Sequence, residues 1–254
     1  VELSLKKVML KKHPLSSKLI EQVERIERLS VCNSDIVISV SNDDHDGLKQ
    51  YNDKKSIFTV QNGVRVLSNH SISKEFNYIK DELSNKTVIL FIGSAHMPNI
   101  DSARFIINDL SLRHSDCYFA IVGSVGECLQ DIELPFNVKI YGKVKDEEKK
   151  AICMYSDIAL NPMYNGSGSN LKIIDYFSSK IPTITTPFGA RGFLIENGQN
   201  AIICDIEKFS DNIKVLQKNK KLKEFLVDNS YEYVKQNLDW KILAEKYMNI
   251  LEKN

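Results

Sequence analysis

The feature that most constrains the fold is a series of short apolar runs, each of which ends at a glycine, a proline or a polar residue. These runs span residues 87–92, 117–122, 138–141, 158–160, 183–185 and 201–203. Helical periodicity separates many of them, at residues 99–112, 146–154, 171–179 and 188–196. Strands that are apolar on both faces and alternate with helices are typical of a parallel sheet. The sequence therefore predicts an α/β fold with a doubly wound, Rossmann-like parallel sheet.

The strand ends carry the residues expected to meet a ligand. In open parallel sheets, ligands bind at the carboxyl ends of the strands. Five features of the sequence fall there: Gly93, Gly123, Gly142, a loop that contains Gly166, and Pro187-Phe188-Gly189.

The first part of the chain follows a different pattern. We expect a helix at residues 15–29, strands at 36–40 and 57–60, and between the strands a helix capped by Ser41. Regular strand–helix alternation begins only after a polar stretch at residues 72–85. We therefore expect a boundary near residue 70, with helices at residues 206–226 and 240–251 closing the second domain.

One loop combines several features of a phosphate site. Five small residues, Gly166, Ser167, Gly168, Ser169 and Asn170, enter the helix predicted at residues 171–179. Such a turn exposes backbone N–H groups at the positive end of the helix dipole, which favours an anion. Lys172 lies in the first turn, where a cation is disfavoured unless an anion is bound. An exposed lysine behind an ordinary serine cap is the alternative for Lys172 taken alone.

Composition excludes several classes of function. The net charge of +1 gives no drive toward nucleic acid, and no apolar run approaches the ~20 residues that span a bilayer. The five cysteines lie far apart without metal-ligand spacing, as in reduced cytosolic proteins. We expect a cytoplasmic chain that binds no metal. The five lysines Lys214, Lys218, Lys220, Lys221 and Lys223 indicate a solvated face, or alternatively a weak attraction to the inner membrane surface.

The ordered motifs resemble one enzyme family over most of the chain. They are VISVS–helix–VQNGV (36–64), FIGSAHMPN (91–99), AIVGS (120–124), VKIYGKV (138–144), residues 156–193 and the closing tryptophan helix. This order resembles the C-terminal, donor-binding half of retaining glycosyltransferases of group 1, which have the two-domain GT-B architecture. The resemblance implies that residues 1–69 are the tail of an acceptor domain plus a crossover, and that 70–254 form the nucleotide-sugar domain.

The resemblance also implies roles for individual residues. Lys172 would neutralise the diphosphate of a UDP- or GDP-sugar donor, and Asp175 would accept hydrogen bonds from the ribose hydroxyls. The remaining donor contacts would come from three segments: the end of the first strand (Gly93, Ser94), the base-framing turn (Tyr141, Gly142, Lys143, Val144) and the small-residue loop (Gly166, Ser167, Gly168, Ser169, Asn170). No tightly bound cofactor is implied.

The sequence departs from the family pattern at three positions. Many members carry two glutamates around the loop, whereas here Asn165 stands near the first position and Asp175 replaces the second. Many members also have a basic residue after the first strand, where this chain offers His96. The candidate catalytic residues are therefore Lys172, Asn165 and His96.

Two other motifs point elsewhere but are weaker. Asp44-His45-Asp46 resembles a metal-binding carboxylate pair, although its place after Ser41 favours helix capping. Gly166-Ser167-Gly168 resembles part of a dinucleotide fingerprint, but the third glycine position is Leu171.

The resulting hypothesis is the donor-binding half of a retaining, metal-independent glycosyltransferase. A carbohydrate or lipid-linked acceptor would bind to an N-terminal domain that is missing here, so we expect this chain to bind nucleotide sugar but to transfer little alone. The alternatives are a catalytically silent nucleotide-sugar-binding partner subunit and a sugar-nucleotide epimerase of related fold.

Overall fold

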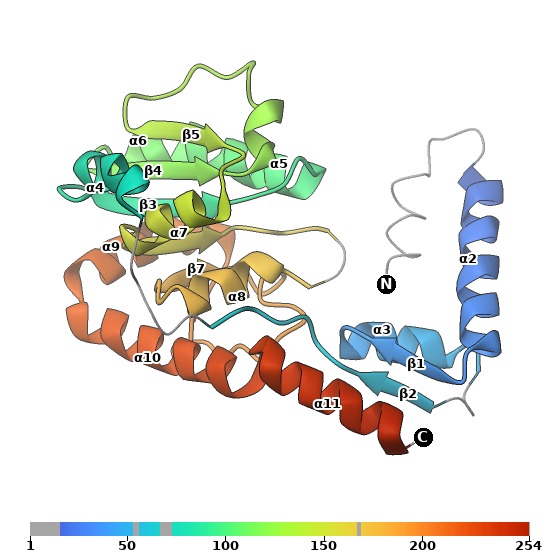
Figure 1. Ribbon diagram of the computed structural model, residues 1–254. Coiled ribbons are helices and arrows are strands. Elements are labelled where there is room, and N and C mark those ends of the chain that lie inside the picture. Colours follow the sequence, from blue (N-terminus) through green and yellow to red (C-terminus); the bar gives the residue numbers. More distant parts are fainter. Residues whose placement is uncertain (1–15, 53–55, 67–72, 167–168, 254) are drawn as a thin grey trace.

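The computed structural model of the chain describes residues 16–52, 56–66, 73–166 and 169–253. A small lobe and a larger lobe are visible in Figure 1, and the last helix, α11 (Trp240–Lys253), extends from one toward the other. The small lobe consists of α2 (Ser16–Asn33), β1 (Ile36–Ser39), α3 (Asn42–Lys49) and β2 (Ser56–Thr59). Its two strands pair in parallel. The boundary predicted near residue 70 lies outside the described residues.

The larger lobe is built on a parallel sheet of six strands in the order β5-β4-β3-β6-β7-β8. The strands are β3 (Thr87–Ile92), β4 (Cys117–Val122), β5 (Val138–Gly142), β6 (Ile158–Asn161), β7 (Thr183–Thr185) and β8 (Ile202–Ile203). The predicted doubly wound, Rossmann-like sheet is confirmed. Strand order reverses between β3 and β6, because β4 and β5 extend the sheet in one direction and β7 and β8 in the other.

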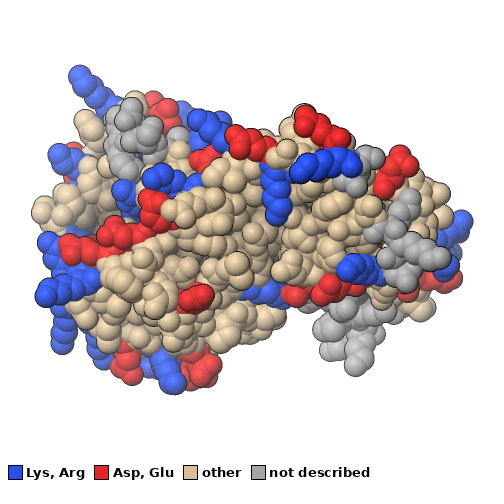
Figure 2. Space-filling model, turned by 90° about the horizontal axis from the view of Figure 1, so that it is seen from below, with Lys and Arg blue, Asp and Glu red and all other residues tan. Residues whose placement is uncertain are grey.

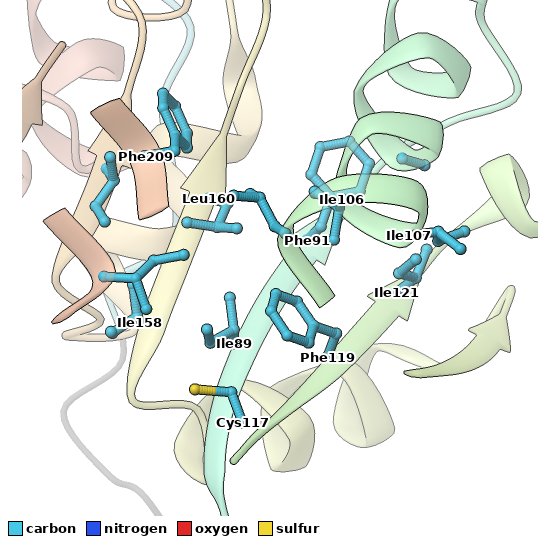
Figure 3. Close-up of a cluster of buried hydrophobic side chains, with 14 of the residues drawn as sticks. Ile89, Phe91, Ile106, Ile107, Cys117, Phe119, Ile121, Ile158, Leu160 and Phe209 are labelled. Carbon is cyan, nitrogen blue, oxygen red and sulfur yellow. The ribbon is translucent and has the colours of Figure 1, made fainter. Parts of the chain in front are cut away.

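Helices cover both faces of this sheet. One face packs against α5 (Met97–Phe105), the π-helical turn η2 (Ile106–Leu110), α6 (Ser111–Arg113) and α9 (Phe209–Lys218). Figure 3 shows the buried cluster on this face, to which the strands contribute Phe91 and Phe119 and the helices contribute Ile106 and Phe209. The other face packs against η1 (Lys74–Phe76), α4 (Asn77–Leu83), α7 (Asp146–Met154) and α8 (Leu171–Ser178). Burial on both faces explains why the strands read as continuous apolar runs.

Two predicted helices differ from the structure. The helix predicted at residues 206–226 is η4 (Ile206–Lys208) followed by α9 and α10 (Lys220–Asn237), because the Asn219 side chain accepts a hydrogen bond from the Leu222 N–H at 3.0 Å and starts a new helix. The helix predicted at residues 188–196 is wrong, since the chain there forms turns. Gly192 has a φ of 91°, and a Cβ at Gly189 would meet Asn161 at 2.6 Å. The glycines therefore follow a path that a helix does not take.

The crossover from the small lobe docks on the end of α10. The Val64 N–H donates to the Leu238 carbonyl at 2.8 Å, and the Gln61 side chain donates to the Gly192 carbonyl at 2.9 Å. No helix of the described ranges combines the length and the apolar character needed to cross a bilayer.

Charge is distributed without a dominant sign. On the face shown in Figure 2, basic and acidic side chains are interspersed, and wide areas carry neither. In the lysine run at residues 214–223, three ion pairs join a lysine to a carboxylate: Lys214–Asp211 at 4.0 Å, Lys220–Glu224 at 3.7 Å and Lys223–Asp157 at 3.7 Å. These contacts agree with a solvated face.

We predict that Gly123→Ala destabilises the protein by about 3 kcal/mol. Gly123 has φ 106° and ψ 179°, a region that essentially only glycine occupies, and a Cβ there would overlap the Gly93 carbonyl oxygen. Urea unfolding measures the loss. The matched control is Gly198→Ala. Gly198 also has a positive φ, 75°, but a Cβ added there would meet nothing within 4 Å, so the free energy of unfolding should fall by only about 1 kcal/mol. Equal losses in the two variants would contradict the steric argument.

Candidate functional site

A cavity of about 310 Å³ opens at the carboxyl ends of β3 and β6. These neighbouring strands flank the point where strand order reverses, which is the usual ligand site of open α/β sheets. The cavity brings together nine residues predicted from the sequence: Gly93, Ser94, His96, Asn165, Gly166, Ser169, Asn170, Lys172 and Asp175. Ser167 and Gly168 lie outside the described residues.

Tyr176 of α8 holds the two strands where they separate. Its hydroxyl accepts a hydrogen bond from the Ile92 N–H of β3 at 2.9 Å and donates to the Leu160 carbonyl of β6 at 3.3 Å. The last paired residues of β3 and β6 are Leu90 and Ala159. The Tyr176 hydroxyl therefore bonds the backbone groups that lie just beyond this pair, the Ile92 N–H and the Leu160 carbonyl. Burial raises the pKa of Tyr176 well above its usual value, and the hydroxyl therefore keeps its proton.

Lys172 projects from the first turn of α8 toward α5. Its Nζ donates to Asn99 Oδ1 at 2.6 Å, lies 3.4 Å from Met163 Sδ, and is 5.0 Å from the centre of the Phe91 ring. These neighbours carry no negative charge, and burial of the ammonium group lowers the pKa of Lys172 to about 7. A partly buried cation whose neighbours among the described residues are neutral favours an anion at the same place.

The amino end of α8 is open to a ligand. Asn170 precedes the helix, and its side chain makes no capping hydrogen bond to it. Instead, Asn170 Nδ2 donates to the Phe188 carbonyl at 3.4 Å. The positive end of the α8 dipole therefore faces the cavity without a side-chain cap.

Asp175 lies one helical turn after Lys172 and lines the same cavity. Its carboxylate is 3.3 Å from Lys149 Nζ of α7, and both side chains are about one third exposed. A ligand hydroxyl that donated to the Asp175 carboxylate would therefore bind beside the ammonium group of Lys149.

Three predicted residues do not line the cavity: Gly142, Lys143 and Val144. Gly142 ends β5 with a φ of 67°, Lys143 pairs with Glu127 at 3.0 Å, and Val144 packs against the core. The turn that they form with Tyr141 follows β5, which β4 separates from the cavity-lining strand β3, and its proposed contact with a base stays a prediction.

Sequence reasoning assigned no role to Arg191 or Met163, which line the cavity together with Phe188, a residue expected there from its place after a strand end. The Arg191 guanidinium lies 4.1 Å from the centre of the Phe188 ring and donates to the Gly166 carbonyl at 3.4 Å. The error in predicting a helix at 188–196 hid Arg191. Its signal was the Phe-Gly-Ala-Arg-Gly sequence shortly after a strand end.

Comparison with known proteins identifies the family. Residues 86–219 match the family described as glycosyl transferases group 1. The chain belongs to this family. An uncharacterized glycosyltransferase of Methanocaldococcus jannaschii is 23% identical over 216 residues, which cover 81% of this chain and 55% of that protein. The chain thus spans about half the length of this relative.

Solved structures share the fold of this group 1 glycosyltransferase chain. Anabaena Alr3699/HepE, crystallised with UDP and glucose, superposes with a TM-score of 0.73 at 14% identity, covering 90% of this chain and 67% of that one. The C-terminal domain of a group 1 glycosyl transferase (LpcC) from Francisella tularensis superposes with a TM-score of 0.52 at 14% identity, covering 70% of this chain and all of that domain. The sheet is therefore that of the C-terminal half of a GT-B glycosyltransferase.

Two groups of possible metal ligands lie outside the lining of the cavity. Atoms of His114, Asp116 and Cys117 lie within 4.8 Å of one another at the start of β4, a cluster that sequence spacing did not indicate. Gln217 Nε2 already donates to Asp116 and Cys117 at 3.1 Å. In Asp44-His45-Asp46, the Ser41 hydroxyl accepts from the Asp44 N–H at 3.1 Å, which confirms the capping interpretation.

We predict that Tyr176→Phe lowers the free energy of unfolding by about 2 kcal/mol, because it leaves the Ile92 N–H and the Leu160 carbonyl buried without this partner. Urea unfolding provides the measurement. Tyr78→Phe removes the same atom from an exposed tyrosine bonded to Glu148 and should cost roughly 0.5 kcal/mol or less. A loss at Tyr176 no larger than that at Tyr78 would rule out the bridging role.

We also predict a pH dependence of stability that originates at Lys172. Its folded pKa of about 7 lies below the ordinary value of 10.5, so between these values the unfolded chain binds more protons at this group. The free energy of unfolding of wild type relative to Lys172→Met should therefore rise with pH in that window, by up to about 1.4 kcal/mol per pH unit. Urea unfolding from pH 6 to pH 10 tests this difference. Lys218→Met, which changes an exposed lysine, is the control. The difference in free energy of unfolding between wild type and this variant should not rise with pH.

Proposed function

We propose that this chain binds a UDP- or GDP-linked sugar in the cavity and supplies the donor half of a retaining, metal-independent glycosyltransferase. The observation that carries the proposal is the meeting of Lys172, the uncapped amino end of α8 and the end of β3 in one cavity at the strand-order reversal. Each of these three elements favours a phosphate, and together they suit a diphosphate.

The proposed reaction exchanges one glycosidic bond for another. The bond between the sugar C1 and the diphosphate oxygen breaks, a bond between C1 and an acceptor hydroxyl oxygen forms on the same face, and the hydroxyl proton leaves with the departing diphosphate or solvent. Negative charge grows on the diphosphate as its bond to C1 breaks. Lys172 and the α8 dipole stabilise that charge, which lowers the barrier.

The ligands of similar solved structures support this choice of donor. The Anabaena protein was crystallised with UDP-glucose, and TarM from S. aureus was crystallised with UDP. In the present chain, Asp175 would accept hydrogen bonds from the ribose hydroxyls. Asp175 is the lone carboxylate among the described residues that line the cavity, and divalent cations usually take several oxygen ligands. The donor set therefore supports a reaction in which cationic side chains neutralise the diphosphate.

We further propose that residues 70–254 form this donor domain and that residues 1–69 belong to an acceptor domain with its crossover. A carbohydrate or lipid-linked acceptor would then approach from the side of the small lobe. A nucleotide-sugar-binding partner without catalysis is the second candidate. It is favoured by Asn165, a neutral amide that stands near a position where many family members carry a glutamate.

The decisive test is calorimetric titration of the chain with UDP and GDP. Wild type should bind one of them, and Lys172→Ala should weaken that binding by roughly 10- to 100-fold, since a charge-assisted hydrogen bond contributes about 1.5–3 kcal/mol. The control Lys218→Ala should bind like wild type. Wild type that binds neither nucleotide, or Lys172→Ala that binds as tightly as wild type, would disprove the assignment. Interconversion of free nucleotide sugars without an acceptor would instead identify an epimerase.

A further inference from the structure

The donor cavity contains a second basic side chain besides Lys172. A diphosphate linked to a sugar carries two negative charges, and Lys172 supplies one positive charge in its protonated form. Of the described residues that line the cavity, Lys172 and Arg191 are the lysine and the arginine. The loop directly after β3, residues 93–96, brings His96 to the cavity and contains no lysine or arginine.

The backbone fixes Arg191 beside the small-residue loop. The next residue, Gly192, has a φ of 91°, and a Cβ on it would meet the Ser169 side chain at 2.6 Å. The Gly192 carbonyl also accepts the hydrogen bond from Gln61 at 2.9 Å. The loop is thus packed against Ser169 on one side and tied to the crossover on the other.

The side chain of Arg191 contacts an aromatic ring and a backbone carbonyl at the cavity. Its guanidinium stacks on the Phe188 ring at 4.1 Å, and its bond to the Gly166 carbonyl is long at 3.4 Å. Burial lowers the pKa of Arg191, and the carboxylates of Asp43 and Asp44 act in the opposite direction. A partly desolvated guanidinium beside a neutral carbonyl gains more from a phosphate than an exposed one does.

We propose that Arg191 is the second cation of the diphosphate site and donates hydrogen bonds to the donor's phosphate oxygens. Arg191 reaches the site from the loop after β7. This inference rests on the proposed function. The planar guanidinium makes two parallel bonds to a phosphate, whereas Lys172 makes a single-point contact.

The test compares ligands that differ only in the diphosphate. Wild type, Arg191→Gln, and the exposed control Arg113→Gln are titrated with uridine and with UDP, or with the guanosine pair if wild type prefers it. We expect Arg191→Gln to weaken UDP binding by roughly 10- to 100-fold and to leave uridine binding unchanged. Arg113→Gln should match wild type for both ligands. Equal UDP affinity in Arg191→Gln and wild type would overturn the inference.

A measurement on wild type covers the case in which Arg191→Gln does not fold. The Arg191 Nε–H resonance, assigned from its loss in Arg191→Lys, should shift on addition of UDP and should not shift with uridine. A resonance that UDP leaves unmoved would also overturn the inference. Wild type that binds neither UDP nor GDP would count against the proposed function itself, and this outcome differs from normal UDP binding that is independent of Arg191.

Discussion

The hydroxyl group of Tyr176 is the contact on which the geometry of the cavity depends. It reaches the end of β3 and the end of β6 at the same time and satisfies a backbone donor on one and a backbone acceptor on the other. Without such a partner, the separation of two buried strands would leave polar groups in the core. The sheet can therefore open at this point, because one side chain compensates for the ladder that ends there.

Helix α8 combines anchoring with ligand binding. Tyr176 fixes it to the sheet, Lys172 joins it to Asn99 of α5, and Asp175 joins it to Lys149 of α7. The helix thus contacts strands and two other helices through three nearby residues, and its uncapped amino end is positioned by all of them. The arrangement explains how a helix of 8 residues holds a charge site in place.

Much of the fold can be predicted from the sequence, because a strand that is buried on both faces has a continuous apolar sequence. Strands β3, β4 and β7 lie where these runs predicted them. The order of the strands was not predictable in the same way, since neighbours in space such as Leu90 and Ala159 are set by packing of the whole sheet. Lys172 and Gly166 were found because a small-residue loop before a helix has a direct physical meaning. Arg191 was missed because apolar spacing in residues 188–196 imitates a helix, while the positive φ of Gly192 becomes evident only in three dimensions.

The hydrogen bond between Gln61 and Gly192 links two parts of the molecule that are 131 positions apart in sequence. Gln61 follows directly after the small lobe, and Gly192 adjoins the arginine of the donor cavity. A different orientation of the small lobe would therefore require either that this hydrogen bond break or that the loop carrying Arg191 move with the lobe.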